Sequence, residues 1–450
     1  MKKELHDIAL RCVKLLNVAL MTVPFAACWY MVYAGRVASP YYARGNWLVI
    51  AVFAVLYGVY GRIYEGFYVS LHRISEMVYS QGLAALVSDG IMYLVIWLLS
   101  KRLPSVWPLL AAFAGQLVLS AAWCWLANRW YFRVFPPKRT VIVYDERQGM
   151  ERLISEYGMT QKFEIVESVS VESCLARNFE PLLQADTAFL CGVHSHERNI
   201  LLKQCVALGM AVYVIPRLGD TIMSGARPIH LFHLPMLRVG RYSPNPEYLL
   251  AKRLFDLVVA GLALIVTSPI LLVTAIAIKA TDGGPVFYRQ CRLTQNGRRF
   301  NVLKFRSMRV DAEKDGVARL STGEKDDRIT PVGHVIRKCR IDELPQILNI
   351  LRGDMSIVGP RPERPEIAAQ YEQELPEFAL RLQAKAGLTG YAQVYGKYNT
   401  TPYDKLQMDL MYIANPSFLE DLRICFATVK ILFMPESTEG VEEGQATAMR

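Results

Sequence analysis

Four apolar stretches in the first third of the chain constrain its fold more than any other feature. They cover residues 16–34, 47–60, 83–99 and 106–126 of the 450-residue sequence. An α-helix rises about 1.5 Å per residue, so about 17–25 apolar residues are enough to cross the hydrocarbon core of a bilayer. The sequence therefore predicts a membrane α-helical bundle of four spans over residues 1–136. The second stretch is the shortest, and its limits are the least defined.

The positive charge of the chain follows its apolar segments. The net charge is +10; residues 1–140 carry 14 Lys and Arg against 5 Asp and Glu, and residues 251–310 carry 10 against 2. The basic residues cluster before the first stretch and after the fourth, whereas each loop between the stretches has two. Because cytoplasmic flanks are enriched in Lys and Arg, both ends of the bundle are expected in the cytoplasm. This distribution is typical of a membrane protein, so nucleic acid is not expected as a partner.

A further apolar segment, residues 257–278, contains 22 uncharged residues and could cross a membrane by itself. Two features favour a hairpin that enters and leaves the bilayer on one face. Basic residues flank the segment on both sides, so a crossing would carry a basic block to the far side. Ser268 and Pro269 lie at its centre, where proline removes a backbone donor and disturbs the helix. We expect a re-entrant helix–break–helix over residues 246–283, with a fifth span as the alternative.

Residues 137–245 have the pattern of a small α/β Rossmann-like domain. Short runs rich in β-branched or aromatic residues alternate with helical patterns, at residues 140–144, 163–166, 187–191 and 211–215. This alternation predicts a parallel sheet. The turn after the first strand lacks the glycine-rich fingerprint of a dinucleotide site, so no cofactor is expected in this domain.

Residues 284–434 carry the chemistry-bearing groups, beginning with two strands joined by a turn near residues 284–308. Residues 285–310 contain seven basic residues and no acidic one. Lys304 and Arg306 alternate with apolar neighbours, so both are expected on one face of a strand. Such a basic face suits phosphate groups at a lipid surface. A purely electrostatic membrane anchor is the alternative.

Asp342 and Glu343 are adjacent carboxylates in a basic setting. Arg337 and two further basic residues precede them closely, and nearby cations favour ionised carboxylates, so we expect a low pKa for Asp342. An ionised carboxylate can bind Mg²⁺ or attack phosphorus. Farther along the chain, two prolines flank Arg361 and should hold it in a stiff, extended segment that is suited to binding phosphate with two donors.

Several motifs between about residues 252 and 434 resemble those of the bacterial sugar transferases, which are monotopic polyprenyl-phosphate glycosyl-1-phosphate transferases. The motifs are KRLFD at 252–256, SP at 268–269, KFRSM at 304–308, DELPQ at 342–346, GDMS at 353–356, GPRPE at 359–363, GLTGYAQV at 387–394 and DLMY at 409–412. The four predicted spans and the α/β insert resemble the large subfamily, typified by undecaprenyl-phosphate galactose and glucose phosphotransferases.

The resemblance implies a reaction. A UDP-sugar would donate its sugar 1-phosphate to undecaprenyl phosphate, giving undecaprenyl-diphospho-sugar and UMP, as the first membrane step of exopolysaccharide, capsule or O-antigen synthesis. Asp342 would form a phosphosugar–aspartyl intermediate, Mg²⁺ would bind Asp342 and Glu343, and Glu343 would orient the metal or manage a proton. The residues implied in binding substrate phosphates or the nucleotide are Lys304, Arg306, Arg337, Gln346, Arg361, Asp409 and Tyr412.

The same resemblance implies a multi-pass protein of the bacterial inner membrane, with membrane lipid as a partner and the catalytic domain in the cytoplasm. The alternative is a non-catalytic membrane scaffold of a polysaccharide assembly complex, although Asp342, Glu343 and Arg361 are all retained. A transporter would need charges within the spans, where Asp89 is the sole acidic candidate. The sequence leaves open the sugar, the pathway, the role of the α/β domain and the oligomeric state, a homo-oligomer included. Residues 435–450 are expected to form a flexible acidic tail.

Overall fold

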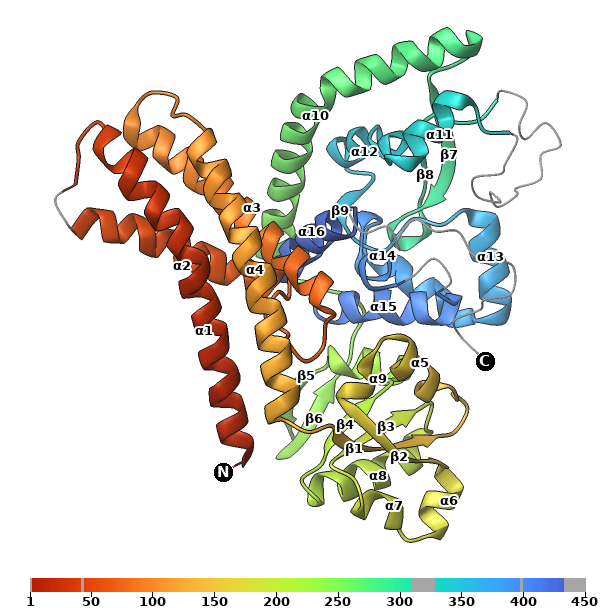
Figure 1. The fold of residues 1–450 in the computed structure, drawn as a ribbon. Coiled ribbons are helices and arrows are strands. Elements are labelled where there is room, and N and C mark those ends of the chain that lie inside the picture. Colours follow the sequence, from red (N-terminus) through yellow and green to blue (C-terminus); the bar gives the residue numbers. More distant parts are fainter. Residues whose placement is uncertain (1, 42–43, 310–327, 397–399, 433–450) are drawn as a thin grey trace. The chain divides into compact units, whose positions relative to one another are not determined.

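The fold is seen in a computed structural model that describes residues 2–41, 44–309, 328–396 and 400–432 (Figure 1). The expected acidic tail at 435–450 lies outside the described residues. The chain forms two compact units, Met1–Ile215 and Pro216–Met449.

Long apolar helices begin the first unit. They are α1 (Lys2–Cys28), which continues through a π-helical turn (Trp29–Tyr33) and a 3-10 turn (Ala34–Arg36), α2 (Arg44–Ile63), α3 (Ile74–Ser100) and α4 (Trp107–Val134). All four are long and apolar enough to cross a membrane. The predicted apolar stretches fall on these helices, and the shortest of them, the second, is extended in α2 to a helix of 20 residues.

Buried polar side chains connect the four helices. The Asn17 amide on α1 donates to the Gln81 Oε1 on α3 at 3.1 Å and accepts from the Tyr57 hydroxyl on α2 at 2.8 Å. The Ser120 hydroxyl on α4 donates to the same Gln81 oxygen at 2.8 Å. Because helices in lipid gain little from apolar contact with one another, such hydrogen bonds help to fix which helices pack together.

A four-stranded parallel sheet with strand order β2-β1-β3-β4 follows in the first unit. Its strands are β1 (Lys138–Tyr144), β2 (Phe163–Ser170), β3 (Thr187–Cys191) and β4 (Ala211–Val214), connected by α5 (Met150–Glu156), α6 (Val171–Ala176), α7 (Glu180–Leu183) and α8 (Ser195–Ala207). Val141 and Val143 pack into one core cluster and Ile142 into another, so β1 is covered on both faces. This two-sided burial explains the continuous apolar run in its sequence.

The second unit begins with α9 (Leu218–Ser224) and the hairpin of β5 (Arg227–Leu231) and β6 (Leu234–Arg238), followed by the long helix α10 (Pro246–Asp282). The expected break in α10 is not a break in helical structure, because one helix of 37 residues continues through Pro269. Figure 1 shows it bent along its length. The Ser268 hydroxyl donates to the Ile265 carbonyl at 2.7 Å, and this is the carbonyl that the missing N–H of Pro269 would otherwise serve.

The rest of the second unit forms a mixed α/β region. The predicted pair of strands is confirmed as the antiparallel ribbon β7 (Phe287–Leu293) and β8 (Arg299–Phe305). The helices and strands that follow are α11 (Pro331–Lys338), α12 (Gln346–Arg352), β9 (Ser356–Val358), α13 (Pro365–Glu374), a 3-10 helix (Pro376–Gln383), β10 (Gly387–Thr389), α14 (Tyr391–Tyr395), α15 (Pro402–Ala414) and α16 (Phe418–Leu432). Strands β9 and β10 pair in parallel.

The first turns of α10 bind four separate segments of this region. Lys252 donates to the Asp421 carboxylate on α16 at 2.9 Å and to the Tyr412 hydroxyl on α15 at 3.1 Å. Arg253 donates to the carbonyls of residues 350 and 351 at the end of α12, at 2.7 and 2.9 Å. Asp256 accepts from the backbone N–H of Ile357 in β9 at 3.0 Å. The base of α10 is therefore joined to α12, β9, α15 and α16.

Both halves of α10 pack against the same compact unit. Ala260 belongs to the core cluster that contains Phe300 and Ile350, whereas Ile278 belongs to a second cluster with Phe305 and Ile336. A straight helix of this length would extend for about 55 Å at 1.5 Å per residue. The bend in α10 is thus what allows its two ends to reach the same α/β region.

We predict that the buried Lys252–Asp421 pair is essential for the stability of the second unit. Asp421 is 1% exposed, and removing one partner of a buried ion pair costs about 3–5 kcal/mol, so Lys252→Met should lower the midpoint of thermal unfolding by roughly 10 °C. The exposed change Lys338→Met is the matched control. Thermal unfolding of the detergent-solubilised protein measures both, and equal midpoints for the two variants would contradict the prediction.

Candidate active site

The adjacent carboxylates lie on a 3-10 turn, Ile341–Glu343, between α11 and α12. The turn follows Arg340, whose φ of 54° is in the left-handed region. This conformation is unfavourable for a residue with a Cβ atom, and it reverses the chain directly after α11. The reversal brings the turn against β8, where the basic residues lie.

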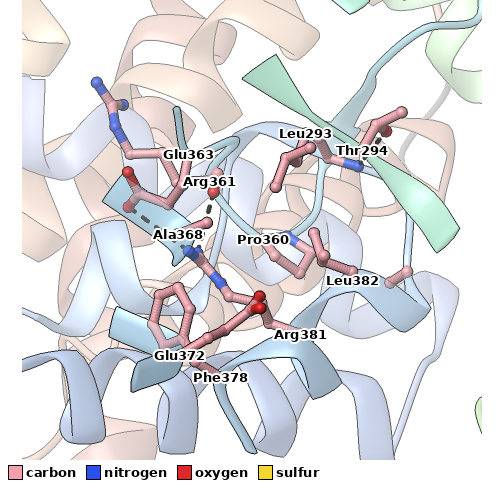
Figure 2. Close-up of a pocket in the computed structure, with 12 residues that line it drawn as sticks. Leu293, Thr294, Pro360, Arg361, Glu363, Ala368, Glu372, Phe378, Arg381 and Leu382 are labelled. Atoms are coloured by element: carbon pink, nitrogen blue, oxygen red, sulfur yellow. Dashed lines mark hydrogen bonds and ion pairs between the residues drawn. The ribbon is translucent and has the colours of Figure 1, made fainter. Parts of the chain in front are cut away.

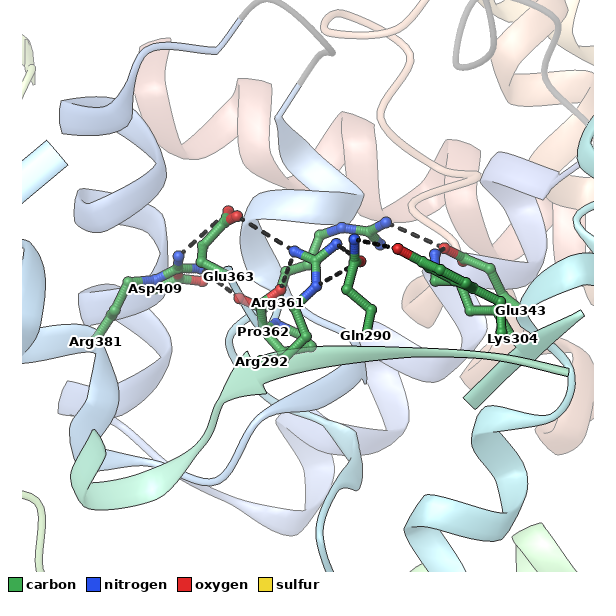
Figure 3. Close-up of polar contacts among 10 residues, drawn as sticks. Gln290, Arg292, Lys304, Glu343, Arg361, Pro362, Glu363, Arg381 and Asp409 are labelled. Carbon is green, nitrogen blue, oxygen red and sulfur yellow. Dashed lines mark hydrogen bonds and ion pairs between the residues drawn. The ribbon is translucent and has the colours of Figure 1, made fainter. Parts of the chain in front are cut away.

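Glu343 joins two cations from distant parts of the sequence. Its Oε1 atom lies 2.8 Å from the Lys304 Nζ on β8 and 3.1 Å from the Arg361 Nη2, as Figure 3 shows. Burial disfavours the charged form of Glu343, but the two cations outweigh this effect and hold the pKa of its carboxyl well below the usual range. The charge of Glu343 in turn raises the pKa of Arg361. Glu343 is therefore ionised, with both cations fixed around it.

Asp342 has a different environment from its neighbour. Its side chain makes no hydrogen bond with another described residue. Burial and the adjacent charge of Glu343 raise the pKa of Asp342, and the opposing effects of Lys304 and Arg337 are smaller. The prediction of a low pKa for Asp342 is wrong, because burial and the charge of Glu343 outweigh the nearby cations. The two carboxylates thus differ: Glu343 is held in ion pairs, and Asp342 has no such partner among the described residues.

Arg337, at the end of α11, contributes a further cation beside Asp342. Its positive charge opposes the rise in the pKa of Asp342. Its Nη1 atom is buried and has no hydrogen-bond partner in the part of the chain that the structure describes. A buried guanidinium nitrogen without an acceptor is a good binding position for an anionic oxygen.

The donor set of this site fits a divalent cation that a substrate would help to bind. No group of three or more His, Cys, Asp and Glu among the described residues could hold a metal ion. Asp342 and Glu343 supply two carboxylates, and Mg²⁺ is commonly held by one or two carboxylates together with substrate phosphates and waters. The two carboxylates fit Mg²⁺ in that way.

Arg306 and Gln346 are also predicted from the sequence to bind substrate phosphate, but both are buried in the structure. Arg306 follows the last residue of β8 and is 8% exposed, and its Nε donates to the Pro285 carbonyl at 2.8 Å. A Cβ atom at Gly284 would lie 2.8 Å from its guanidinium, so a larger residue there would require the Arg306 side chain to shift. Gln346 begins α12 and is 5% exposed. Arg306 therefore holds the chain at the end of α10.

Asp409 and Tyr412 lie in buried clusters behind the carboxylates. Asp409 is paired with Arg381, whose Nη2 lies 2.6 Å from the Asp409 Oδ2. The Tyr412 hydroxyl donates to the Asp421 Oδ1 at 2.7 Å and belongs to the cluster at the base of α10. Of the predicted site residues, the structure thus brings Lys304, Arg337, Asp342, Glu343 and Arg361 together and places the others behind or beside them.

Sequence reasoning missed Arg292 and Arg381 as residues of this region. Both contact the loop of residues 360–363, and a small pocket beside this loop is lined by Arg361 and Arg381 with mostly apolar neighbours, among them Pro360, Phe378 and Leu382 (Figure 2). Arg381 lies in a segment without any of the quoted motifs, so no local pattern identifies it. Arg292 follows the predicted strand and is hidden among other basic residues of the 285–310 segment.

Comparisons with known proteins match this half of the chain. The sequence profile of the bacterial sugar transferases matches residues 247–435. The chain is 37% identical over 234 residues to UDP-N-acetylgalactosamine-undecaprenyl-phosphate N-acetylgalactosaminephosphotransferase of Aeromonas hydrophila, covering 51% of this chain and 54% of that protein. It is 41% identical over 206 residues to UDP-glucose:undecaprenyl-phosphate glucose-1-phosphate transferase of Caulobacter vibrioides, covering 45% and 76%. It is also 40% identical over 190 residues to exopolysaccharide production protein PSS of Rhizobium leguminosarum bv. phaseoli, covering 40% and 94%. The chain thus spans about half the length of the first of these relatives.

Proposed function

The chain belongs to the bacterial sugar transferase family, and we propose that it transfers a sugar 1-phosphate from a UDP-sugar to undecaprenyl phosphate, forming undecaprenyl-diphospho-sugar and UMP. The relatives named for this reaction use UDP-sugars and undecaprenyl phosphate. The observation that carries the proposal is that the Asp342 carboxylate has no hydrogen bond or ion pair to another described residue, beside a Glu343 held by two cations. The reaction would be the first membrane step of exopolysaccharide, capsule or O-antigen synthesis.

In the proposed mechanism Asp342 is the nucleophile. Its carboxylate oxygen attacks the sugar-linked phosphorus of the UDP-sugar, the bond from that phosphorus to the bridging oxygen breaks, and UMP leaves. An oxygen of undecaprenyl phosphate then attacks the same phosphorus and releases the Asp342 carboxylate. Two displacements replace one difficult transfer between two anionic substrates. The freedom of Asp342 from ion pairs with its neighbours is what this role requires.

The cations would bind and orient the phosphates. Arg361 donates one N–H to Glu343, and Lys304 donates one of its three, which leaves donors on both for phosphate oxygens. The buried Nη1 of Arg337 is a third donor that could bind a phosphate oxygen. Phosphoryl transfer relies mainly on positioning and on stabilising charge, so pre-fixed cations lower the barrier. Mg²⁺ held by Asp342 and Glu343 would supply further neutralisation of the diphosphate charge.

We further propose that α10 is a re-entrant membrane helix and that the catalytic unit lies on the cytoplasmic side of the inner membrane. Large apolar side chains project from much of α10, and only 11% of its most apolar window is buried. Pro269 lies within the helix, and both of its halves pack against one α/β region. Nucleotide sugars are cytoplasmic, which fits this placement.

The proposed reaction is tested by measuring UMP release from UDP-glucose, UDP-galactose and UDP-N-acetylgalactosamine, with and without undecaprenyl phosphate and Mg²⁺. At least one sugar should support turnover that needs both, and chelation with EDTA should abolish it. Asp342→Asn should lower the rate by on the order of 10³-fold or more, because it removes the nucleophile. Glu374→Gln, a change to an exposed carboxylate at the end of α13, is the control. No UMP from any of these sugars would favour a scaffold, and wild-type turnover by Asp342→Asn would rule out the covalent step.

The pH dependence should report the ionisation of Asp342. Since Asp342 must be charged to attack and Arg337 lowers the pKa of its carboxyl, Arg337→Gln should raise that pKa. The acid limb of the kcat/KM profile should then move to higher pH, because less of the enzyme has ionised Asp342 at a given acidic pH. Lys338→Gln removes the same charge one residue along, on an exposed side chain, and should leave the limb unchanged. A limb that stays in place or moves to lower pH in Arg337→Gln would contradict this assignment.

Chemical labelling of cysteines from each side of the membrane should show whether α10 crosses the bilayer. Single cysteines introduced at Glu247 and Arg289, both exposed, lie just inside the start of α10 and beyond its end. In a background lacking the exposed native cysteines 12, 291 and 339, both should react with a membrane-impermeant maleimide in inverted vesicles and neither in spheroplasts. Labelling of the two positions from opposite sides would establish a fifth span instead.

A further inference from the structure

We infer that Arg381 is a positioning residue for the proposed transfer, which acts with Arg292 to fix the loop that carries Arg361. The inference rests on the proposed function, in which Arg361 binds substrate phosphate. It assigns Asp409 to the support of Arg381 rather than to the substrate. The network is drawn in Figure 3.

The loop of residues 360–363 cannot hold itself through local hydrogen bonds. Two of its four residues are prolines, which have no backbone N–H to donate. Its carbonyl groups must therefore be satisfied by donors from elsewhere. The Gly387 N–H binds the Pro360 carbonyl at 2.9 Å, and the next three carbonyls, those of residues 361–363, are each bound by a different donor.

Arg381 binds the first of these carbonyls from one side. Its Nη2 donates to the Arg361 carbonyl at 3.0 Å. Its Nε donates to the Asp409 Oδ2 at 2.8 Å, and its Nη1 lies 3.5 Å from the Glu363 Oε1. Only 3% of the Arg381 side chain is exposed, so it does not reach substrate. Arg381 acts through the backbone of Arg361.

Arg292 and its neighbour bind the next two carbonyls from the β7 side. The Arg292 Nη1 donates to the Pro362 carbonyl at 3.0 Å and lies 3.8 Å from the Glu363 Oε2. The Leu293 N–H donates to the Glu363 carbonyl at 3.0 Å. Glu363 therefore lies between two arginines that come from opposite sides of the loop.

The chemistry at position 381 requires arginine. Its fork of five N–H donors serves a carbonyl and two carboxylates at once, whereas lysine has a single nitrogen on a flexible stem. Asp409, which is 1% exposed, supplies the charge that makes burial of Arg381 tolerable. The Arg361 guanidinium then contacts Glu343 from a loop fixed on both sides, 3.1 Å from the Oε1 that also binds Lys304.

The test is a double-mutant cycle on UMP release by the full-length protein in lipid nanodiscs. A displacement of about 1 Å of a positioned group can cost about 10²-fold in rate, so Arg381→Lys should lower kcat/KM by roughly that factor. In an Arg361→Ala background the same change should cost little more, because it acts through Arg361. Ile424→Val, a small buried change in α16 of the same core, controls for loss of stability. Equal losses from Arg381→Lys with and without Arg361 would overturn the inference.

Amide hydrogen exchange reports on the same loop without any activity. The peptide containing the Leu293 amide, which donates to the loop, should exchange faster in Arg381→Lys than in wild type and in Ile424→Val. Unchanged exchange of this peptide would also overturn the inference. If the wild-type protein releases no UMP from any UDP-sugar, the proposed function fails, whereas faster exchange in Arg381→Lys would still establish that Arg381 holds the loop.

Discussion

The base of α10 is the constraint on which the catalytic unit depends. Its first turns bind the end of α12 through Arg253 and β9 through Asp256. Helix α12 directly follows the turn that carries Asp342 and Glu343, and β9 directly precedes the loop that carries Arg361. The two chain segments that form the candidate active site are therefore both tied to one helix, which is long and apolar enough to cross a membrane. With α10 in the bilayer as proposed, this arrangement would fix the height of the site relative to the lipid surface.

The distribution of charge within the site depends on which of the two carboxylates, Asp342 or Glu343, forms ion pairs with the cations. Lys304 and Arg361 both contact one oxygen of Glu343, and this lowers the pKa of its carboxyl while the neighbouring charge raises that of Asp342. Pairs of carboxyl groups whose pKa values are pushed apart by their surroundings are common where two acids have different tasks. Here Glu343 is the counter-charge of both cations, whereas Asp342 forms no ion pair with another described residue.

Local sequence patterns were sufficient for some features and not for others. The alternating β7–β8 ribbon, strand β3 and the Ser268–Pro269 irregularity are visible within a few residues of sequence, because each reflects a local period or a missing donor. The Arg381–Asp409 pair joins residues 28 positions apart, and Lys252–Asp421 joins residues 169 apart. Such partners depend on tertiary packing, so neither pair could be predicted. The raised pKa of Asp342 was missed for the same reason, since its first cause is burial, which depends on tertiary packing.

Arg306 illustrates how a correct local pattern can lead to a different role. The alternation that predicts a shared strand face for Lys304 and Arg306 ignores where the strand ends, and β8 ends at Phe305. Beyond that point Arg306 turns to the Pro285 carbonyl, just after the last turn of α10. Near the other end of the helix, Lys252 of α10 binds Asp421, so buried cations hold the chain to the α/β region at both ends of α10. This is the physical basis of the re-entrant proposal: a helix held at both ends by one compact domain on one side of a bilayer would have to return to that side.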